Sequence, residues 1–182
     1  MLFRSAAEYP GKLNYSTAGL GTTTHLAGEL LRVTAQVDIS PVPYKGSGAA
    51  MADLLSGRVQ MAFSSMAAIQ PYLQSGKLRA IASTGLKRNP QDLSLPTMAE
   101  LIPNFYVDLW TMLLAPQKTP DRTVQNINDA VRVALKTTQL NDEFGRMGQE
   151  PTGSSPLETD SFLRSETIKW STIMKSARIF TE

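Results

Sequence analysis

The chain has 182 residues, 42% of them hydrophobic, and a formal net charge of +2 at pH 7. Both signs of charge are spread along the sequence, which gives no basis for nucleic acid or an anionic membrane surface as a partner. The absence of cysteine and the presence of one histidine, His25, exclude disulfides, thiol catalysis and multi-histidine metal sites. No apolar run approaches the roughly 20 residues that span a bilayer, and the first residues lack the apolar centre of an export signal.

The first half of the sequence repeats one unit of strand, small-residue loop and helix. A helix tail over 3–9, ended by Pro10, comes before the first unit. Strands are expected over 13–16, 37–42, 59–63 and 78–83. The first three are followed by helices over about 22–35, from 48 to 56 and from 66 to 75, and Gly57 and Gly76 stand where a helix-ending glycine belongs. This alternation predicts an α/β fold with a parallel sheet covered by helices.

Ligands of such sheets bind at the carboxyl ends of the strands. The loops 17–24, 43–48 and 64–66 lie at that edge, and each is small, polar and placed at a helix start. The first loop carries Gly19 and Gly21 followed by three threonines, which favours an anion such as a carboxylate or phosphate. It has neither a Walker lysine nor the third glycine of a dinucleotide-binding loop. The alternative is that these residues only cap helices.

The second half changes character after Pro116. An irregular loop over 85–96 leads to a capping box from Thr97 to Glu100, and 105–114 is expected to be a long crossover strand. Thr119 is expected to cap a helix with Pro120 at its first position. A shorter helix and a third helix, opened by a capping box at Ser155, complete the chain. Their apolar stripes need a surface to cover them, and we expect a missing partner segment or a homodimer through these helices.

Read together, short motifs in this order resemble one family, the solute-binding receptors of tripartite tricarboxylate transporters, also called Bug receptors. The matching residues are Pro10-Gly11-Lys12-Leu13-Asn14-Tyr15-Ser16, Gly19-x-Gly21-Thr22-x-x-His25-Leu26-Ala27-Gly28-Glu29, Val42-Pro43-Tyr44-Lys45-Gly46, Asp53-Leu54-Leu55-Ser56-Gly57-Arg58-Val59, Gly76-Lys77-Leu78-Arg79-Ala80, Pro96-Thr97-x-Ala99-Glu100, Trp110, and Leu114-Ala115-Pro116 with Thr119-Pro120. The resemblance runs from about residue 8 to 178. The sequence departs from the family pattern at Met112, where a glycine is usual, which bears on local packing near the hinge.

The resemblance implies the two-lobed fold of type II periplasmic binding proteins. Residues 1–12 would be the remnant of a helix of lobe one, 13–107 the ligand-binding lobe two, and 108–182 a crossover strand and helices that return to lobe one. Family members are longer ahead of this sequence, so we expect one wall of the cleft to be absent and ligand binding to be weak. The implied function is non-catalytic binding of a di- or tricarboxylate, amino acid or aromatic acid in the periplasm, for delivery to membrane subunits.

The predicted ligand-binding residues come from the three loops at the sheet edge. The first loop forms the main carboxylate cradle, with hydroxyl and backbone N–H donors. We expect no catalytic residue, metal or cofactor. The predicted set is Ser16, Thr17, Ala18, Gly19, Gly21, Thr22, Thr23, Tyr44, Lys45, Gly46, Ser47, Ser64 and Ser65.

Several of these residues have simpler interpretations. Lys45 also fits a solvated surface lysine, and Ser64 and Ser65 fit helix caps. His25, on an apolar helix face, fits a packed, hydrogen-bonded histidine, and Trp110 and Trp170 fit core positions.

Two other functions stay open at this point. One is the effector-binding domain of a LysR-type regulator, although residues 1–12 are too few for the helix-turn-helix that should come before it. The other is a small enzyme acting on a carboxylated or phosphorylated substrate. It would need a general base, and His25 and Asp53 are the candidates.

Overall fold

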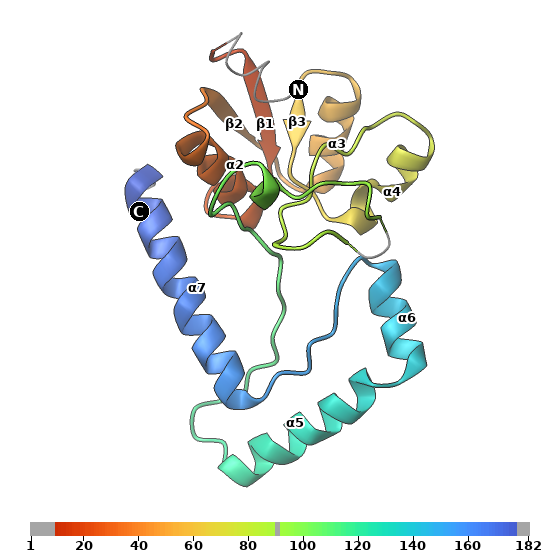
Figure 1. Cartoon of the computed structure of the whole chain (residues 1–182), viewed down its shortest axis with the longest axis vertical. Helices are drawn as coiled ribbons and strands as arrows, with labels where there is room; N and C mark the ends of the chain where they lie inside the picture. The colour runs from red at the N-terminus through yellow and green to blue at the C-terminus, as the bar shows by residue number, and fades with distance from the viewer. Residues whose placement is uncertain (1–9, 90–91, 178–182) are drawn as a thin grey trace. The chain divides into compact units, whose positions relative to one another are not determined.

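The computed structural model describes residues 10–89 and 92–177 (Figure 1). The helix tail expected over 3–9 lies outside these residues. The chain divides into two compact units, one made of the described residues of Met1–Leu109 and Ile173–Glu182 and the other of Trp110–Thr172.

The first unit is built on a parallel sheet of three strands in the order β2-β1-β3. The strands are β1 (Leu13–Thr17), β2 (Ile39–Pro43) and β3 (Met61–Ala62). β1 is the central strand, paired over its whole length with β2 and through Tyr15 and Ser16 with β3. Three of the four expected strands are therefore confirmed, with shifted ends.

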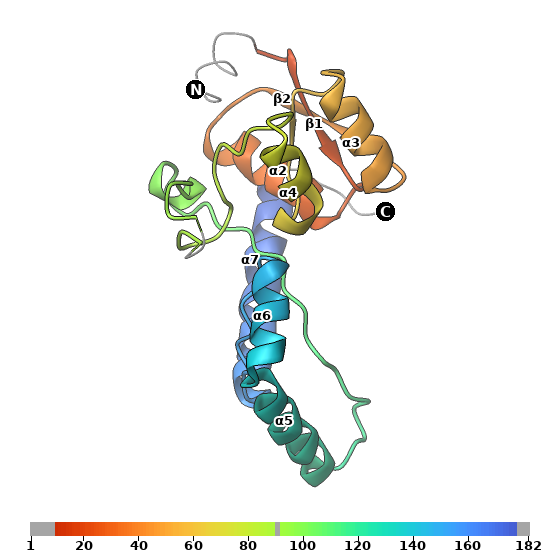
Figure 2. The same ribbon diagram turned by 90° about the vertical axis from the view of Figure 1, so that its right-hand side faces the viewer.

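Three helices follow the three strands: α2 (Thr23–Thr34), α3 (Ser47–Leu55) and α4 (Met66–Gln74). The chain moves from β1 to β2 and then back across β1 to β3. Right-handed crossovers therefore put α2 and α3 on opposite faces of the sheet, as Figure 2 shows. Gly57 and Gly76 end α3 and α4 with positive φ angles of 78° and 68°, as expected.

Tyr15 fixes the contact between β1 and α2. Its side chain is fully buried, and a Cβ atom on Gly28 would lie 2.1 Å from its ring, so only glycine fits there. The Tyr15 hydroxyl donates a hydrogen bond of 2.9 Å to Oε1 of the buried Glu29. The other oxygen of Glu29 pairs with Arg32 at 2.6 Å. Burial in this cluster raises the pKa of Tyr15.

The segment after α4 does not form the expected fourth strand over 78–83. Only Ser83 makes a bridge, a parallel one to Thr97. No residue over 78–83 is buried, and Ile81 is 50% exposed, so this segment has neither the backbone partner nor the covered faces of an inner strand. The expected capping box is confirmed: it opens the short 3₁₀ helix η1 (Met98–Glu100), and Thr97 and Glu100 each accept a hydrogen bond from the other's N–H.

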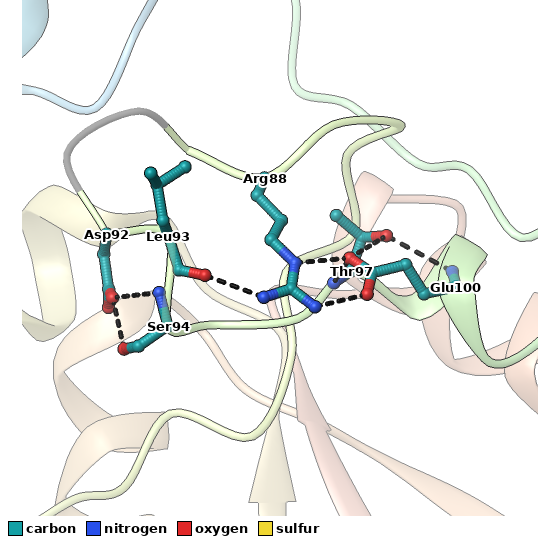
Figure 3. Close-up of polar contacts among 6 residues, drawn as sticks. All are labelled: Arg88, Asp92, Leu93, Ser94, Thr97 and Glu100. Atoms are coloured by element: carbon teal, nitrogen blue, oxygen red, sulfur yellow. Dashed lines mark hydrogen bonds and ion pairs between the residues drawn. The ribbon is translucent and has the colours of Figure 1, made fainter.

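Arg88 joins the irregular loop before η1 to this capping box (Figure 3). Its Nε donates to Glu100 Oε1 at 2.8 Å, and its Nη1 donates to the Leu93 carbonyl oxygen at 2.8 Å. The hydrogen bond from Arg88, followed by the bond from the Thr97 N–H, lowers the pKa of Glu100 to about 2.

The long strand expected over 105–114 is also wrong. This segment is extended but belongs to no ladder of the described residues. The Val107 N–H donates to the Thr84 carbonyl oxygen at 3.0 Å, while Phe105 and Val107 are buried. Phe105 and Val107 thus pack without the neighbouring strand that a ladder requires, whereas the later leucines of the segment are exposed.

The second unit contains α5 (Asp121–Leu135), α6 (Thr138–Arg146) and most of α7 (Pro156–Ala177). Three helices were expected here. The cap of α5 falls one residue later than predicted, because Pro120 and not Thr119 is its N-cap. The predicted box at α7 is confirmed: the Ser155 N–H donates to Glu158 Oε2 at 2.8 Å, and the Glu158 N–H donates to Ser155 Oγ at 3.3 Å.

Glu166 on α7 joins two tryptophans within the second unit. It is 5% exposed, and its Oε2 accepts hydrogen bonds from the indole N–H groups of Trp110 at 3.2 Å and Trp170 at 3.0 Å. Lys169 pairs with its other oxygen. Burial acts to raise the pKa of Glu166, but the bonds from Lys169 and the two indoles outweigh it and leave the pKa lowered.

Candidate functional site

The register of the sheet brings the three predicted loops to one edge. Thr17, the last residue of β1, lies beside Pro43, the last residue of β2. Ser16 lies beside Ala62, the last residue of β3. The Tyr44 N–H donates to the Thr17 carbonyl oxygen at 2.9 Å, which extends the pairing into the second loop. The loops after the strands therefore begin at neighbouring points of the sheet.

The first loop, residues 18–22, is held by bonds between its backbone and nearby hydroxyls. The Ala18 N–H donates to Thr24 Oγ1 at 3.0 Å, and the Gly19 N–H donates to Thr17 Oγ1 at 3.2 Å. The Thr22 hydroxyl donates to the Gly19 carbonyl oxygen at 2.6 Å. The hydroxyls predicted to donate to a ligand thus act, at Thr17 and Thr22, to shape the loop.

His25 provides a further contact to the same loop from the first turn of α2. Its Nδ1 accepts a hydrogen bond of 3.1 Å from the Gly21 N–H. An accepting Nδ1 carries no proton, so the neutral ring bears its proton on Nε2. The side chain is 4% exposed, in agreement with the expected packed and hydrogen-bonded histidine. Gly21 itself has a φ of 77°, which favours glycine.

A smaller group of donors remains open at this loop. Among the residues that the structure describes, the N–H groups of Leu20 and Thr23 and the Thr23 hydroxyl make no hydrogen bond. Thr23 is the first residue of α2, where N–H groups have no acceptor one turn earlier. These donors, together with the positive end of the helix dipole, suit an anion.

Tyr44 of the second loop belongs to a polar cluster with Asp53 of α3 and Arg58, which follows that helix. The Tyr44 hydroxyl donates to Asp53 Oδ2 at 2.8 Å, and Arg58 pairs with Asp53 Oδ1 at 2.9 Å. The bond to Asp53 raises the pKa of Tyr44, and the bonds from Tyr44 and Arg58 lower the pKa of Asp53. A carboxylate with a lowered pKa is a weak base, so this arrangement gives no support to Asp53 as a general base.

The other predicted residues lie in the second and third loops, at the starts of α3 and α4. Lys45 is exposed, and Gly46 is the N-cap of α3 with a φ of 101°. Ser47 begins α3, and its side chain lies outside the described part of the structure. Ser64 and Ser65 are exposed at the start of α4, and Ser65 is its N-cap without a side-chain capping bond.

Sequence reasoning missed Leu20, whose side chain is 73% exposed and whose backbone N–H is open at this loop. Thr24 was among the threonines expected to donate to an anion, but its hydroxyl oxygen instead accepts from the Ala18 N–H. The sequence signal for Leu20 was its position between two glycines. Within the described residues, no group of three or more His, Asp or Glu side chains could hold a metal ion. In the same part of the chain, no helix combines the length and apolarity needed to cross a membrane.

The sequence as a whole matches the model of the tripartite tricarboxylate transporter family receptor over residues 2–179. The chain belongs to this receptor family. Members of the family are periplasmic solute-binding receptors and not enzymes, which supports the expected absence of catalysis at the level of the family.

Curated members of the family resemble the chain over most of its length. It is 34% identical to the UPF0065 protein in the tcbD-tcbE intergenic region of Pseudomonas sp. (strain P51), covering 98% of this chain and 54% of that protein. It is 32% identical to Protein BugT of Bordetella pertussis, covering 91% of this chain and 51% of BugT. A relative from Pseudomonas knackmussii is 35% identical and is covered over 98% of its own length. The chain thus spans about half the length of the first two relatives.

Solved structures of family receptors share the fold. Rpa4515 of R. palustris, solved with adipate, has a TM-score of 0.85 at 34% identity, over 97% of this chain and 59% of that one. The periplasmic binding protein BugD has a TM-score of 0.82 at 27% identity, over 100% and 62%. MatC from Rhodopseudomonas palustris, solved with bound malate, has a TM-score of 0.76 at 27% identity, over 94% and 60%. The predicted fold class is confirmed.

Proposed function

We propose that this chain contributes the carboxylate-binding loops of a receptor for small dicarboxylates or related acids. The observation that carries the proposal is the set of open donors at the carboxyl end of the central strand. The N–H group of Leu20 lies in the first loop and the N–H group and hydroxyl of Thr23 lie at the start of α2, and no described residue accepts from them. A carboxylate is acceptor-only and can take several such bonds at once.

The other two loops add groups of the same kind. Lys45 supplies a cation, and Ser64 and Ser65 supply exposed hydroxyls, on loops that start beside the first one. The printed ligands of two relatives, adipate for Rpa4515 and malate for MatC, support an acid with two carboxylates. Ligand contacts at Tyr44, Gly46 and Ser47 remain part of the proposal.

We also propose the roles that membership of the family implies for the whole receptor. Residues 13–107 form the ligand-binding lobe, and 108–182 carry a crossover segment and helices that belong to a second lobe. Ligand closes the lobes in the periplasm, and the closed form is offered to the membrane subunits of a tripartite transporter. The family match supports this assignment.

A homodimer through the C-terminal helices is a separate proposal. Large apolar side chains are exposed there, among them Val133, Leu157 and Ile168, which are 69%, 76% and 68% exposed. A second copy of the chain would cover them. Light scattering at micromolar concentration tests this proposal, and a monomer overturns it.

Thermal unfolding with a panel of ligands tests the binding proposal. Adipate and malate should raise the melting temperature, while hexane-1,6-diol, which has the length of adipate without its charges, should not. A ligand at 100 times its dissociation constant stabilises by about 2.7 kcal/mol, which is roughly 5–10 °C for a chain of this size. The proposal fails for this chain if no carboxylate in the panel shifts the transition more than the diol.

A further inference from the structure

The peptide groups on both sides of Leu20 are held by side chains of α2 and its cap. The Gly19 carbonyl oxygen accepts from Thr22, through the hydroxyl at 2.6 Å and the N–H at 3.3 Å. The Gly21 N–H donates to His25 Nδ1 at 3.1 Å. The first bond fixes the plane of the 19–20 peptide, and the second fixes the plane of the 20–21 peptide.

These two planes determine where the open donor of Leu20 points. In a trans peptide the carbonyl oxygen and the N–H point in opposite directions. Because the Gly19 oxygen is turned toward Thr22, the Leu20 N–H is turned away from it. The hydrogen bond from the Gly21 N–H to His25 limits the rotation that remains, because a loop with glycines at 19 and 21 has little stiffness of its own. Both glycines have positive φ angles, 128° and 77°.

The imidazole of His25 is well placed for this task. It is 4% exposed and rises from a helix turn that Tyr15 anchors, since the Tyr15 hydroxyl lies 3.4 Å from the His25 carbonyl oxygen and 2.9 Å from Glu29 Oε1. A buried acceptor on an anchored helix holds the Gly21 peptide more rigidly than an exposed side chain would.

We propose that His25 is a positioning residue of the carboxylate site, acting through the Gly21 N–H to fix the loop that presents the Leu20 N–H. The inference rests on the proposed carboxylate site for its functional meaning. The hydrogen bond from the Gly21 N–H to His25 Nδ1, called the clamp from here on, is a property of the unliganded loop. His25 does not touch the ligand in this account, and its Nδ1 must stay unprotonated for the clamp to exist.

Nuclear magnetic resonance tests the clamp without any ligand. In the ¹⁵N-labelled wild-type chain, long-range couplings from the ring protons should show the Nε2–H tautomer at neutral pH. The Gly21 amide should show a through-hydrogen-bond coupling to Nδ1 and slow exchange with solvent. A proton on Nδ1, or a Gly21 amide that exchanges as fast as an open loop amide, overturns the proposal.

Two substitutions separate the hydrogen bond from the packing of the ring. His25→Asn keeps an acceptor, Oδ1, close to the position of Nδ1, whereas His25→Leu keeps similar bulk without an acceptor. We expect the Gly21 amide to stay protected in His25→Asn and to lose protection in His25→Leu. Adipate affinity should be near wild type in the first variant and roughly fivefold or more weaker in the second.

The outcomes distinguish this inference from the proposed function. If the wild type binds adipate and both variants bind alike, the positioning role is wrong while the receptor assignment stands. If the wild type binds neither adipate nor malate, the proposed function fails for this chain, and the tautomer and the Gly21 exchange rate still decide whether the clamp exists. If His25→Leu does not fold, the His25 tautomer and the Gly21 exchange rate of the wild type decide whether the clamp exists.

Discussion

The ring of Tyr15 lies against the backbone of Gly28, so close that a Cβ atom on Gly28 would stand 2.1 Å from the ring carbons. Tyr15 is on the central strand and Gly28 is on the helix that follows it, with the candidate loop between them. This contact therefore sets the distance between strand and helix at the point where the loop leaves the sheet.

Gly28→Ala should destabilise the chain because neither the buried ring nor the helix backbone can move aside freely. Overpacking of this kind typically lowers the free energy of unfolding by about 1–3 kcal/mol. Chemical denaturation of the variant measures this decrease. Gly48→Ala is the matched control, because Gly48 is also helical and a Cβ atom there would meet nothing within 4 Å. Equal stability of the two variants would contradict the close approach.

The ion pair between Arg88 and Glu100 predicts a pH dependence of stability. The pKa of Glu100 is lowered to about 2 in the folded chain, from an ordinary value of 4.5. Its ionised form is thus favoured by folding, so the contribution is complete above about pH 4.5 and is lost as the pH falls toward 2.

The difference in melting temperature between wild type and Glu100→Gln should therefore shrink as the pH is lowered from 6 to about 2. Glu150→Gln, at an exposed position of the second unit, serves as the control and should show no such trend. A Glu100→Gln difference that stays constant over this range would count against the ion pair.

Glu166 is the polar centre of the second unit, and removing its charge should loosen that unit. Glu166→Ala leaves the N–H groups of Trp110 and Trp170 without their acceptor. The free energy of unfolding should fall by about 1–3 kcal/mol. The tryptophan emission should shift, because the surroundings of the indoles change. Glu150→Ala, at an exposed position of the same unit, should leave the emission unchanged. Unaltered emission in Glu166→Ala would show that this cluster does not form.

The parallel sheet and its first three helices were predictable because each rests on local signals that agree. Apolar strands, glycine-containing loops and helix-ending glycines such as Gly57 and Gly76 mark the boundaries independently of distant contacts. The strands expected over 78–83 and 105–114 failed for the opposite reason. An extended apolar segment becomes a strand only if another backbone lies alongside, and sequence periodicity carries no record of that neighbour.

For the candidate site, the sequence indicated a loop but not which of its groups stay free to donate. The spacing of Gly19, Gly21 and the threonines predicted an anion loop after the first strand, and the structure places that loop between β1 and α2. Which hydroxyl donates outward depends on side-chain torsions, and the structure turns Thr17 and Thr24 inward as acceptors for Gly19 and Ala18. The role proposed for Leu20 rests on its backbone N–H, which residue type does not reveal.

Isothermal titration of adipate into the wild type and Thr23→Val tests the central claim most directly. Valine keeps the shape of threonine and removes the open hydroxyl, so affinity should fall roughly tenfold or more for a bond to a carboxylate. Thr123→Val, at an exposed position on α5, should bind as the wild type does. Adipate binding that is weakened only by Thr23→Val is the result that the account predicts. Equal binding by all three proteins would contradict it, because the carboxylate would then lie elsewhere.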